Sequence, residues 1–158
     1  LTVGEVDISI LKNQAFLNDD YLNIMFKILS DRIVEAFSAQ LHYDIRTKYW
    51  AYEKINNSNT LDENYKGIRP APGYPCCPDH SEKTIIFKVL NAEKAGLKLT
   101  ETYGMVPASS VCGYYFANDD AHYFSVGNFN VDQINDYANR KSINIEEAEK
   151  LLKNRLNY

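Results

Sequence analysis

The sequence lacks three features that would direct it to nucleic acid or a membrane: an excess of positive charge, long apolar runs and paired cysteines. Its 17 basic side chains face 21 acidic ones, a formal charge of −4. Nucleic acids and anionic membranes both require a concentrated positive surface. The longest uncharged apolar run, residues 111–117, is far shorter than the roughly 20 residues of a membrane-spanning helix. We therefore predict neither a nucleic-acid partner nor a membrane partner.

Cysteine is scarce and provides no disulfide framework. The three cysteines are odd in number and two of them, Cys76 and Cys77, are adjacent, which fits a reducing cytoplasm. No basic stretch before an apolar core marks a secretory signal. Because the chain begins with Leu1 rather than Met, we expect part of a longer protein or a processed product.

Motifs for metal binding and covalent catalysis are also missing. No CxxC pair has a second half, adjacent cysteines are poor zinc ligands, and nothing marks a base beside a cysteine nucleophile. No glycine-rich loop could hold a phosphate. The weak metal candidates are Cys76, Cys77, His80, Cys112 and His122. We therefore assign no catalytic residue and no metal site.

What is present favours a single α+β domain. With 158 residues, 45% of them apolar, the chain can form one core. The predicted order is a long helix, a stiff loop, a helix, short strands and two further helices. Because helices and strands do not alternate regularly, we expect an antiparallel twisted sheet with flanking helices.

The first predicted helix is long. It starts at residues 18–20, where Asn and two Asp suit the positive end of a helix, and runs to about residue 45. Its apolar residues recur at spacings of three, four and seven, as in an amphipathic helix. They are Tyr21, Ile24, Met25, Ile28 and Leu29, continued by Ile33, Ala36, Phe37 and Leu41. A polar loop at 56–59 follows.

Clear boundary signals mark the later elements. Capping-box spacings at 79–82, 130–133 and 144–147 open three helices, the first ending near Lys94. Residues 97–101 alternate as in a strand. The runs at 111–117 and 122–127 predict a hairpin around residues 118–120. The side chains expected to face inward from the three helices are Ile86, Phe87, Leu90, Ile134, Tyr137, Ala138, Ala148, Leu151 and Leu152.

Residues 63–80 are the most unusual segment. Four of the five prolines lie between residues 70 and 78, and each restricts its own backbone and that of its predecessor. A stiff, apolar segment is more typical of a binding loop than of a linker. On such a backbone Arg69 could bind a carboxylate through two hydrogen bonds, with Tyr74 nearby and Gly73 allowing close approach. An ordinary turn with a surface arginine is an equally open alternative.

Two carboxylates and two aromatic clusters could contribute to the same site. Asp31 and Glu35 are four residues apart on one line of the first helix, which suggests a positively charged partner. Periodicity alone favours the alternative that Arg32 neutralises them on a solvated face. The rings at 114–116 and 123–124 could pack around a sulfonium or ammonium group, although core packing is the default for most of them.

These segments together resemble a known family. Residues 69–75 read RPAPGYP and residues 77–83 read CPDHSEK, which strongly resembles the signature of the C-terminal activation domain of cobalamin-dependent methionine synthase. Further similar blocks are 31–37, 49–50, 63–65, 99–101, 113–116 and 136–141. The resemblance is clearest over residues 18–158. We interpret residues 1–158 as the C-terminal part of this S-adenosylmethionine-binding domain.

The resemblance implies a function in repair. In this family the domain binds S-adenosylmethionine and presents its methyl group for the reductive remethylation of cob(II)alamin. The cobalamin is held by a separate cobalamin-binding domain, and the electron comes from flavodoxin or a similar reductase. Because the chemistry needs cobalt, this chain is not expected to turn over alone.

The resemblance also implies roles for individual residues. Arg69 would bind the carboxylate of the ligand and Glu35 would face its cationic end, whereas Asp31 would meet the cobalamin-binding domain. The other implied ligand contacts are Ala71, Gly73, Tyr74, Tyr123 and Phe124.

The sequence departs from the family pattern at several positions. Val106 and Tyr114 stand where Trp is usual, Cys76 replaces Ala, and Phe124 replaces Tyr with the loss of a hydroxyl. The family domain also extends beyond the N-terminus of this chain, where it carries an acidic residue that helps to hold the ligand. These departures favour an alternative function, a non-catalytic interaction or regulatory module that docks on a cobalamin-binding domain without binding S-adenosylmethionine. An independent methyltransferase ranks last.

Overall fold

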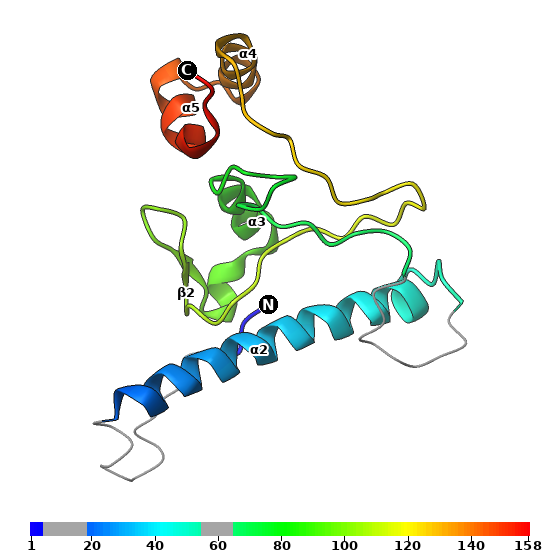
Figure 1. The fold of residues 1–158 in the computed structure, drawn as a ribbon. Helices are drawn as coiled ribbons and strands as arrows, with labels where there is room; N and C mark the ends of the chain where they lie inside the picture. Colours follow the sequence, from blue (N-terminus) through cyan, green and yellow to red (C-terminus); the bar gives the residue numbers. More distant parts are fainter. Residues whose placement is uncertain (5–18, 55–64) are drawn as a thin grey trace.

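The computed structural model describes residues 1–4, 19–54 and 65–158 (Figure 1). Predictions for residues 5–18 and 55–64, including the loop at 56–59, lie outside the described residues. The helices are α2 (Asp20–Asp44), which continues into a π-helical turn (Ile45–Tyr49), α3 (Glu82–Leu90), a 3-10 turn (Ala92–Ala95), α4 (Val131–Lys141), α5 (Ile145–Leu152) and a last 3-10 turn (Lys153–Arg155). No helix in the described ranges combines the length and apolarity needed to cross a membrane.

The long helix α2 forms as predicted and lies along one edge of the molecule (Figure 1). The Asp19 carboxylate caps it by accepting hydrogen bonds from the backbone N–H groups of Tyr21 (2.9 Å) and Leu22 (3.2 Å). The side that packs against the rest of the chain contains Ser30, Val34 and His42. The regularly spaced apolar residues of α2 are therefore mostly on its exposed side.

Helix α3 is shorter than predicted. Asn91 adopts a left-handed conformation (φ 51°) and ends the helix at Leu90, so that the 3-10 turn replaces the expected last turn. The expected inward face does not enter a core. Ile86 and Phe87 are half-buried and Leu90 is exposed, because all three border a cavity described below.

The sheet is antiparallel but consists of only two short strands in the described part of the chain, β1 (Lys98–Leu99) and β2 (Met105–Val106), with Lys98 opposite Val106. Together with the helices it confirms an α+β single domain.

The predicted hairpin between 111–117 and 122–127 is wrong, because both segments bond to the proline-rich segment instead. Tyr114 N–H donates to the carbonyl oxygen of Pro70 (2.9 Å), and Val126 N–H donates to that of Pro75 (3.2 Å). Prolines have no N–H group to return, so within the described residues this pairing forms a single isolated bridge, between Ile68 and Phe116.

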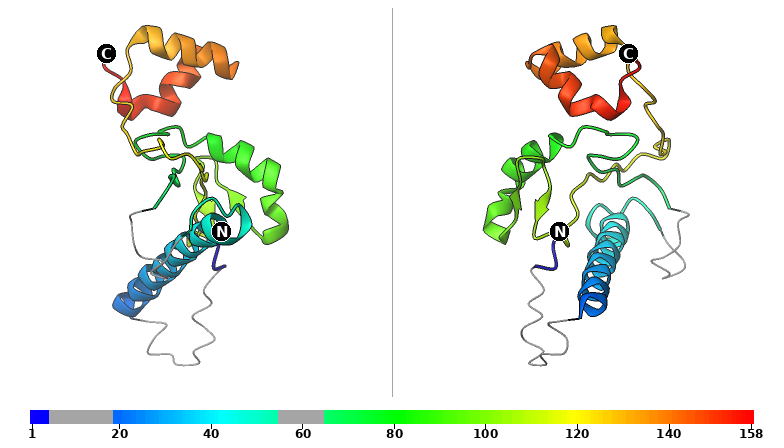
Figure 2. Two further views of the ribbon diagram at one scale, coloured as in Figure 1. Left: turned by 90° about the vertical axis from the view of Figure 1, so that its right-hand side faces the viewer. Right: turned by 60° about the vertical axis from the view of Figure 1, so that its left-hand side comes forward.

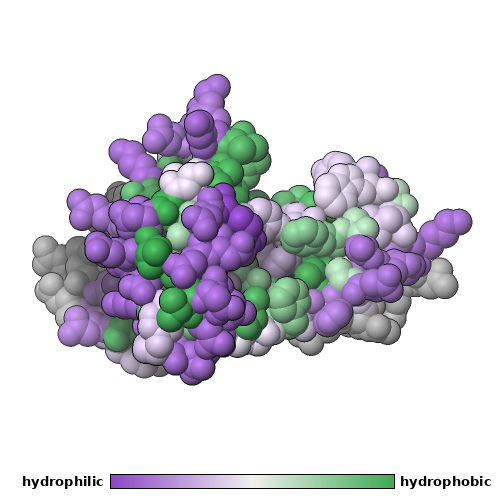
Figure 3. Space-filling view, turned by 90° about the horizontal axis from the view of Figure 1, so that it is seen from above, coloured by the Kyte–Doolittle hydropathy of each residue, from purple (hydrophilic) through white to green (hydrophobic). Residues whose placement is uncertain are grey.

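The C-terminal pair α4–α5 has its own core. Ile134 and Ala148 are fully buried and Ala138 and Leu152 nearly so, as predicted. Both helix starts are capped as the sequence predicts, by Asn130 with Gln133 and by Asn144. Figure 2 shows the pair as a layer on the far side of α3 from α2, and Figure 3 shows its outer surface as mostly hydrophilic.

A buried carboxylate joins this pair to α3. Asp79 accepts hydrogen bonds from the N–H (2.7 Å) and hydroxyl (2.8 Å) of Ser81, from the Tyr137 hydroxyl, and from the Lys141 ammonium (2.8 Å). Lys141 also pairs with Glu82. Asp79 thus links the start of α3 to α4 rather than closing the predicted capping box, since Ser81 is the N-cap residue and makes no side-chain cap bond.

Candidate functional site

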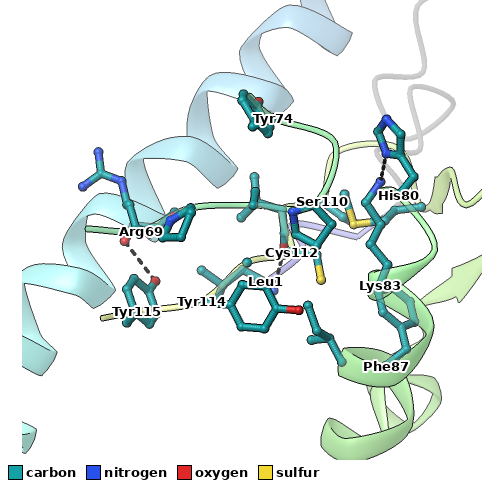
Figure 4. A pocket seen from close by; sticks show the side chains of 18 of the residues that line it. Leu1, Arg69, Tyr74, His80, Lys83, Phe87, Ser110, Cys112, Tyr114 and Tyr115 are labelled. Carbon is teal, nitrogen blue, oxygen red and sulfur yellow. Dashed lines mark hydrogen bonds between the residues drawn. The ribbon is translucent and has the colours of Figure 1, made fainter. Parts of the chain in front are cut away.

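A cavity of about 630 Å³ lies between α2, the proline-rich segment, α3 and the chain around residues 110–115 and 123–124. Its size is typical of pockets for small organic ligands. Figure 4 shows Arg69 at the end next to α2 and His80, Lys83 and Phe87 at the end next to α3. The walls between these ends are mostly apolar and aromatic, with Tyr114 and Tyr115 on one side.

The structure brings together most of the residues for which the family resemblance implies a contact with the ligand. The cavity is lined by Glu35, Arg69, Ala71, Tyr74, Tyr123 and Phe124. Gly73 is absent from this lining, and so is Asp31. Asp31 is exposed on α2, where its carboxylate accepts a hydrogen bond from the Ser109 hydroxyl (2.9 Å).

Tight local geometry shapes the proline-rich segment. Gly73 has φ +99°, and a Cβ there would lie 2.1 Å from the His80 ring, so the position requires glycine. Its N–H donates to the carbonyl oxygen of Cys77 (2.7 Å). Gly113 allows its own segment to lie close to the proline-rich segment, since a Cβ at this position would lie 2.7 Å from the carbonyl oxygen of Pro70. Gly73 therefore shapes the loop from behind the cavity wall.

Arg69 is half-buried, and its backbone and side chain are both oriented by tyrosines. Its N–H donates to the Tyr123 hydroxyl (2.9 Å), which ties the 122–127 segment to the proline-rich segment. Its guanidinium carbon lies 5.4 Å from the centre of the Tyr65 ring. Within residues 1–4, 19–54 and 65–158 no carboxylate forms an ion pair with this guanidinium. Arg69 is thus positioned and unneutralised in this part of the chain.

A buried histidine lies behind this end of the cavity. His42 stacks on Tyr115 (ring centres 5.0 Å apart) and meets the edge of Tyr65 (4.9 Å). Burial lowers the pKa of His42 to about 4, and the nearby positive charges of Arg46 and Arg69 add to this effect. His42 is therefore neutral at physiological pH and adds no competing charge beside Arg69.

The end of the cavity next to α3 was missed by the sequence analysis. Lys83 is only 7% exposed, and its ammonium group contacts His80 Nδ1 (2.9 Å) and the carbonyl oxygen of Tyr103 (3.1 Å). Burial lowers the pKa of Lys83. Burial also raises the pKa of the nearby Cys112 thiol, which disfavours a reactive thiolate. The only local signal was the three-residue spacing from His80 to Lys83, which places both on one helical face.

The site can hold a small ligand with separated charges. Arg69 offers a planar cation suited to a carboxylate, and Glu35 on α2 offers a negative charge at the same cavity. The aromatic residues between them suit a flat ring system or a soft cation.

Comparison with known families decides the classification. The sequence profile described as "Vitamin B12 dependent methionine synthase, activation domain" matches residues 2–142, most of the chain. This chain belongs to the methionine synthase activation domain family. The prediction from the RPAPGYP signature is therefore confirmed.

A solved structure agrees with the family assignment. The MetH reactivation domain bound to AdoHcy is similar to this chain with a TM-score of 0.84 and 45% sequence identity. The match covers 92% of this chain and 46% of that one, so this chain spans about half the length of that activation domain structure.

Proposed function

We propose that this chain binds S-adenosylmethionine in the cavity described above and presents its methyl group to cobalamin held by a cobalamin-binding domain. The observation that carries the proposal is the similarity, at 45% identity, to a reactivation domain bound to AdoHcy, the product left when S-adenosylmethionine loses its methyl group. The cavity and the unneutralised guanidinium of Arg69 support it independently.

The residues of this chain would act by binding and orienting. Arg69 would bind the carboxylate of the ligand, Glu35 would lie toward its ammonium and sulfonium charges, and the rings of Tyr123 and Phe124 would cover the sulfonium end. Tyr74 and Ala71 would hold the ligand from the proline-rich segment. We assign no proton transfer to any of these residues.

Cobalamin, reduced by an electron from flavodoxin or a similar reductase, would supply the nucleophile that takes the methyl group, while the bonding electrons of the broken S–CH3 bond stay on sulfur. The exposed Asp31 lies outside the cavity but four residues from Glu35, where a docked cobalamin-binding domain could reach both. Three cysteines without disulfide bonds support a cytoplasmic location.

The proposal is tested by calorimetric titration with S-adenosylmethionine. Arg69→Ala should weaken binding by about 1.5–3 kcal/mol, at least tenfold, because a charged hydrogen bond is lost. Arg140→Ala is the matched control, since Arg140 is exposed on α4 and pairs with Asp136 (2.9 Å). Equal affinity of Arg69→Ala and the parent chain would overturn the assigned site.

The second candidate function is an interaction module without the ligand. It is favoured by the position of Asp31, which is exposed and outside the cavity. A chain that shows no thermal shift with saturating S-adenosylmethionine, but captures a cobalamin-binding domain unless Asp31 is changed to Ala, would select this function.

A further inference from the structure

The exposed side of α2 carries a series of large apolar side chains. Seven large apolar side chains are 36% to 68% exposed over about four turns of this helix. We call them the α2 face: Tyr21, Ile24, Met25, Ile28, Leu29, Ile33 and Phe37. Scattered surface apolar residues are normal, but a contiguous patch of this kind on a stable protein marks an interface.

The charge of α2 argues against a membrane as the occupant of this surface. The helix contains four carboxylates and two basic side chains, Lys27 and Arg32. Helices that lie on anionic membranes are instead rich in Lys and Arg on their polar side. A second copy of this chain is also a poor partner, because two such helices and two chains of net charge −4 would repel each other.

The size of the solved relative indicates what covers the α2 face. More than half of that reactivation domain has no counterpart in this chain, whereas 92% of this chain matches it. A helix buries its apolar side against another element in a stable domain, and the apolar side of α2 is exposed in the described part of the chain.

We propose that the α2 face is a docking surface for a polypeptide layer equivalent to the unmatched part of the reactivation domain. The contact is apolar at Ile24, Ile28 and Leu29. Asp31 and Glu35 border it, because they follow Ile28 at helical spacings of three and seven. One edge of the docked layer therefore lies beside the cavity at Glu35.

The experiment co-expresses this chain with the unmatched part of the related reactivation domain and measures association by sedimentation velocity. We expect a one-to-one complex in which hydrogen exchange of the α2 amides is slowed. Ile28→Glu places a charge in the contact and should weaken the complex at least tenfold. Val131→Glu is the matched control, because Val131 is similarly exposed (50% against 46% for Ile28) on α4, away from the α2 face.

Three results would overturn the proposal. They are two soluble parts that do not associate, a complex that Ile28→Glu leaves intact, and a chain that instead dimerises or binds anionic vesicles through this face. Titration of Ile28→Glu alone with S-adenosylmethionine separates this proposal from the ligand site. Unchanged affinity with a lost complex would leave the proposed ligand function standing.

Discussion

The α4–α5 pair and helix α2 differ in whether their apolar side chains are buried or exposed. In the α4–α5 pair, Ile134 and Ala148 are fully buried in a shared cluster, and Phe129 and Leu156 pack against this cluster. In α2, a comparable set of apolar residues remains exposed, while polar Ser30 and His42 are buried. The pair buries its apolar residues within itself, whereas the described part of the chain leaves those of α2 exposed.

The difference shows that amphipathic spacing identifies an apolar face without identifying what covers it. The covering element of α4 is α5, only a few residues along the chain. No described element covers the α2 face. The cavity lies between α2 and α3, so Glu35 and Ser38 of α2 line it on one side and Ile86 and Phe87 of α3 on another.

The largest loss of stability is expected for Ile134→Ala in the α4–α5 core. Ile134 is fully buried in the α4–α5 core, so its truncation should lower the free energy of unfolding by about 2–5 kcal/mol. Denaturant unfolding followed by circular dichroism measures the loss. A change below about 1 kcal/mol would show that the pair has a loose core and would remove the contrast with α2.

The link between α3 and the α4–α5 pair is tested next by Asp79→Asn. The substitution keeps the shape of the side chain but removes the charge that Lys141 and Tyr137 contact. The expected loss at neutral pH is about 1.5–3 kcal/mol, the contribution of hydrogen bonds to a charged group. Denaturant unfolding measures it, with Asp136→Asn, an exposed carboxylate on α4, as the control.

The same carboxylate gives a pH dependence. Burial opposes ionisation, but hydrogen bonds from Lys141, Tyr137 and Ser81 outweigh it and hold the pKa of Asp79 below its usual value. Because the unfolded chain has the higher pKa, about 3.9, this stabilisation is complete above that value and is lost as pH falls through the folded pKa. The stability difference between the parent chain and Asp79→Asn should therefore shrink in acid, and a constant difference would contradict the assignment.

A smaller effect is expected from Asn144→Ala. The Asn144 side chain accepts a hydrogen bond from Glu147 N–H (2.7 Å) at the start of α5. Its loss should cost about 0.5–2 kcal/mol, measured by thermal unfolding. Asn144→Asp is the control, since an acidic cap retains the bond and favours the helix dipole. Equal destabilisation by both variants would show that the cap is unimportant.

Sequence reasoning succeeded where the decisive contacts are local. Asn130 with Gln133 and Asn144 with Glu147 are three residues apart, so these two caps could be predicted from their spacing. The same spacing at 79–82 forms no capping box, because Asp79 bonds to the distant Lys141 instead. The stiffness of the proline-rich segment was equally local, because each proline restricts its own backbone. That stiffness left the binding role of Arg69 and an ordinary surface turn equally open. The binding role came from the family resemblance, and the structure places Arg69 in the cavity lining.

Sequence reasoning failed where distant segments compete. The 111–117 run has apolar character suited to either partner, and its actual partner near Pro70 lies about forty residues earlier in the chain. The early end of α3 depends on the backbone of Asn91, a residue that tolerates the left-handed region but does not require it. The position of Lys83 at the cavity could not be predicted, because its ammonium group is held partly by the carbonyl oxygen of Tyr103, which is distant in the sequence, as well as by His80.

The smallest change in the free energy of unfolding is expected for Ile28→Ala, which tests directly whether the α2 face is exposed. Ile28 is 46% exposed on α2, so truncation forms no cavity and removes little buried surface. Ala also has the higher helix propensity, which offsets the loss by a few tenths of a kcal/mol. The free energy of unfolding of the isolated chain should therefore change by less than about 0.5 kcal/mol, against several for Ile134→Ala. If denaturant unfolding instead gave similar losses for both isoleucines, the α2 face would already be covered within the chain.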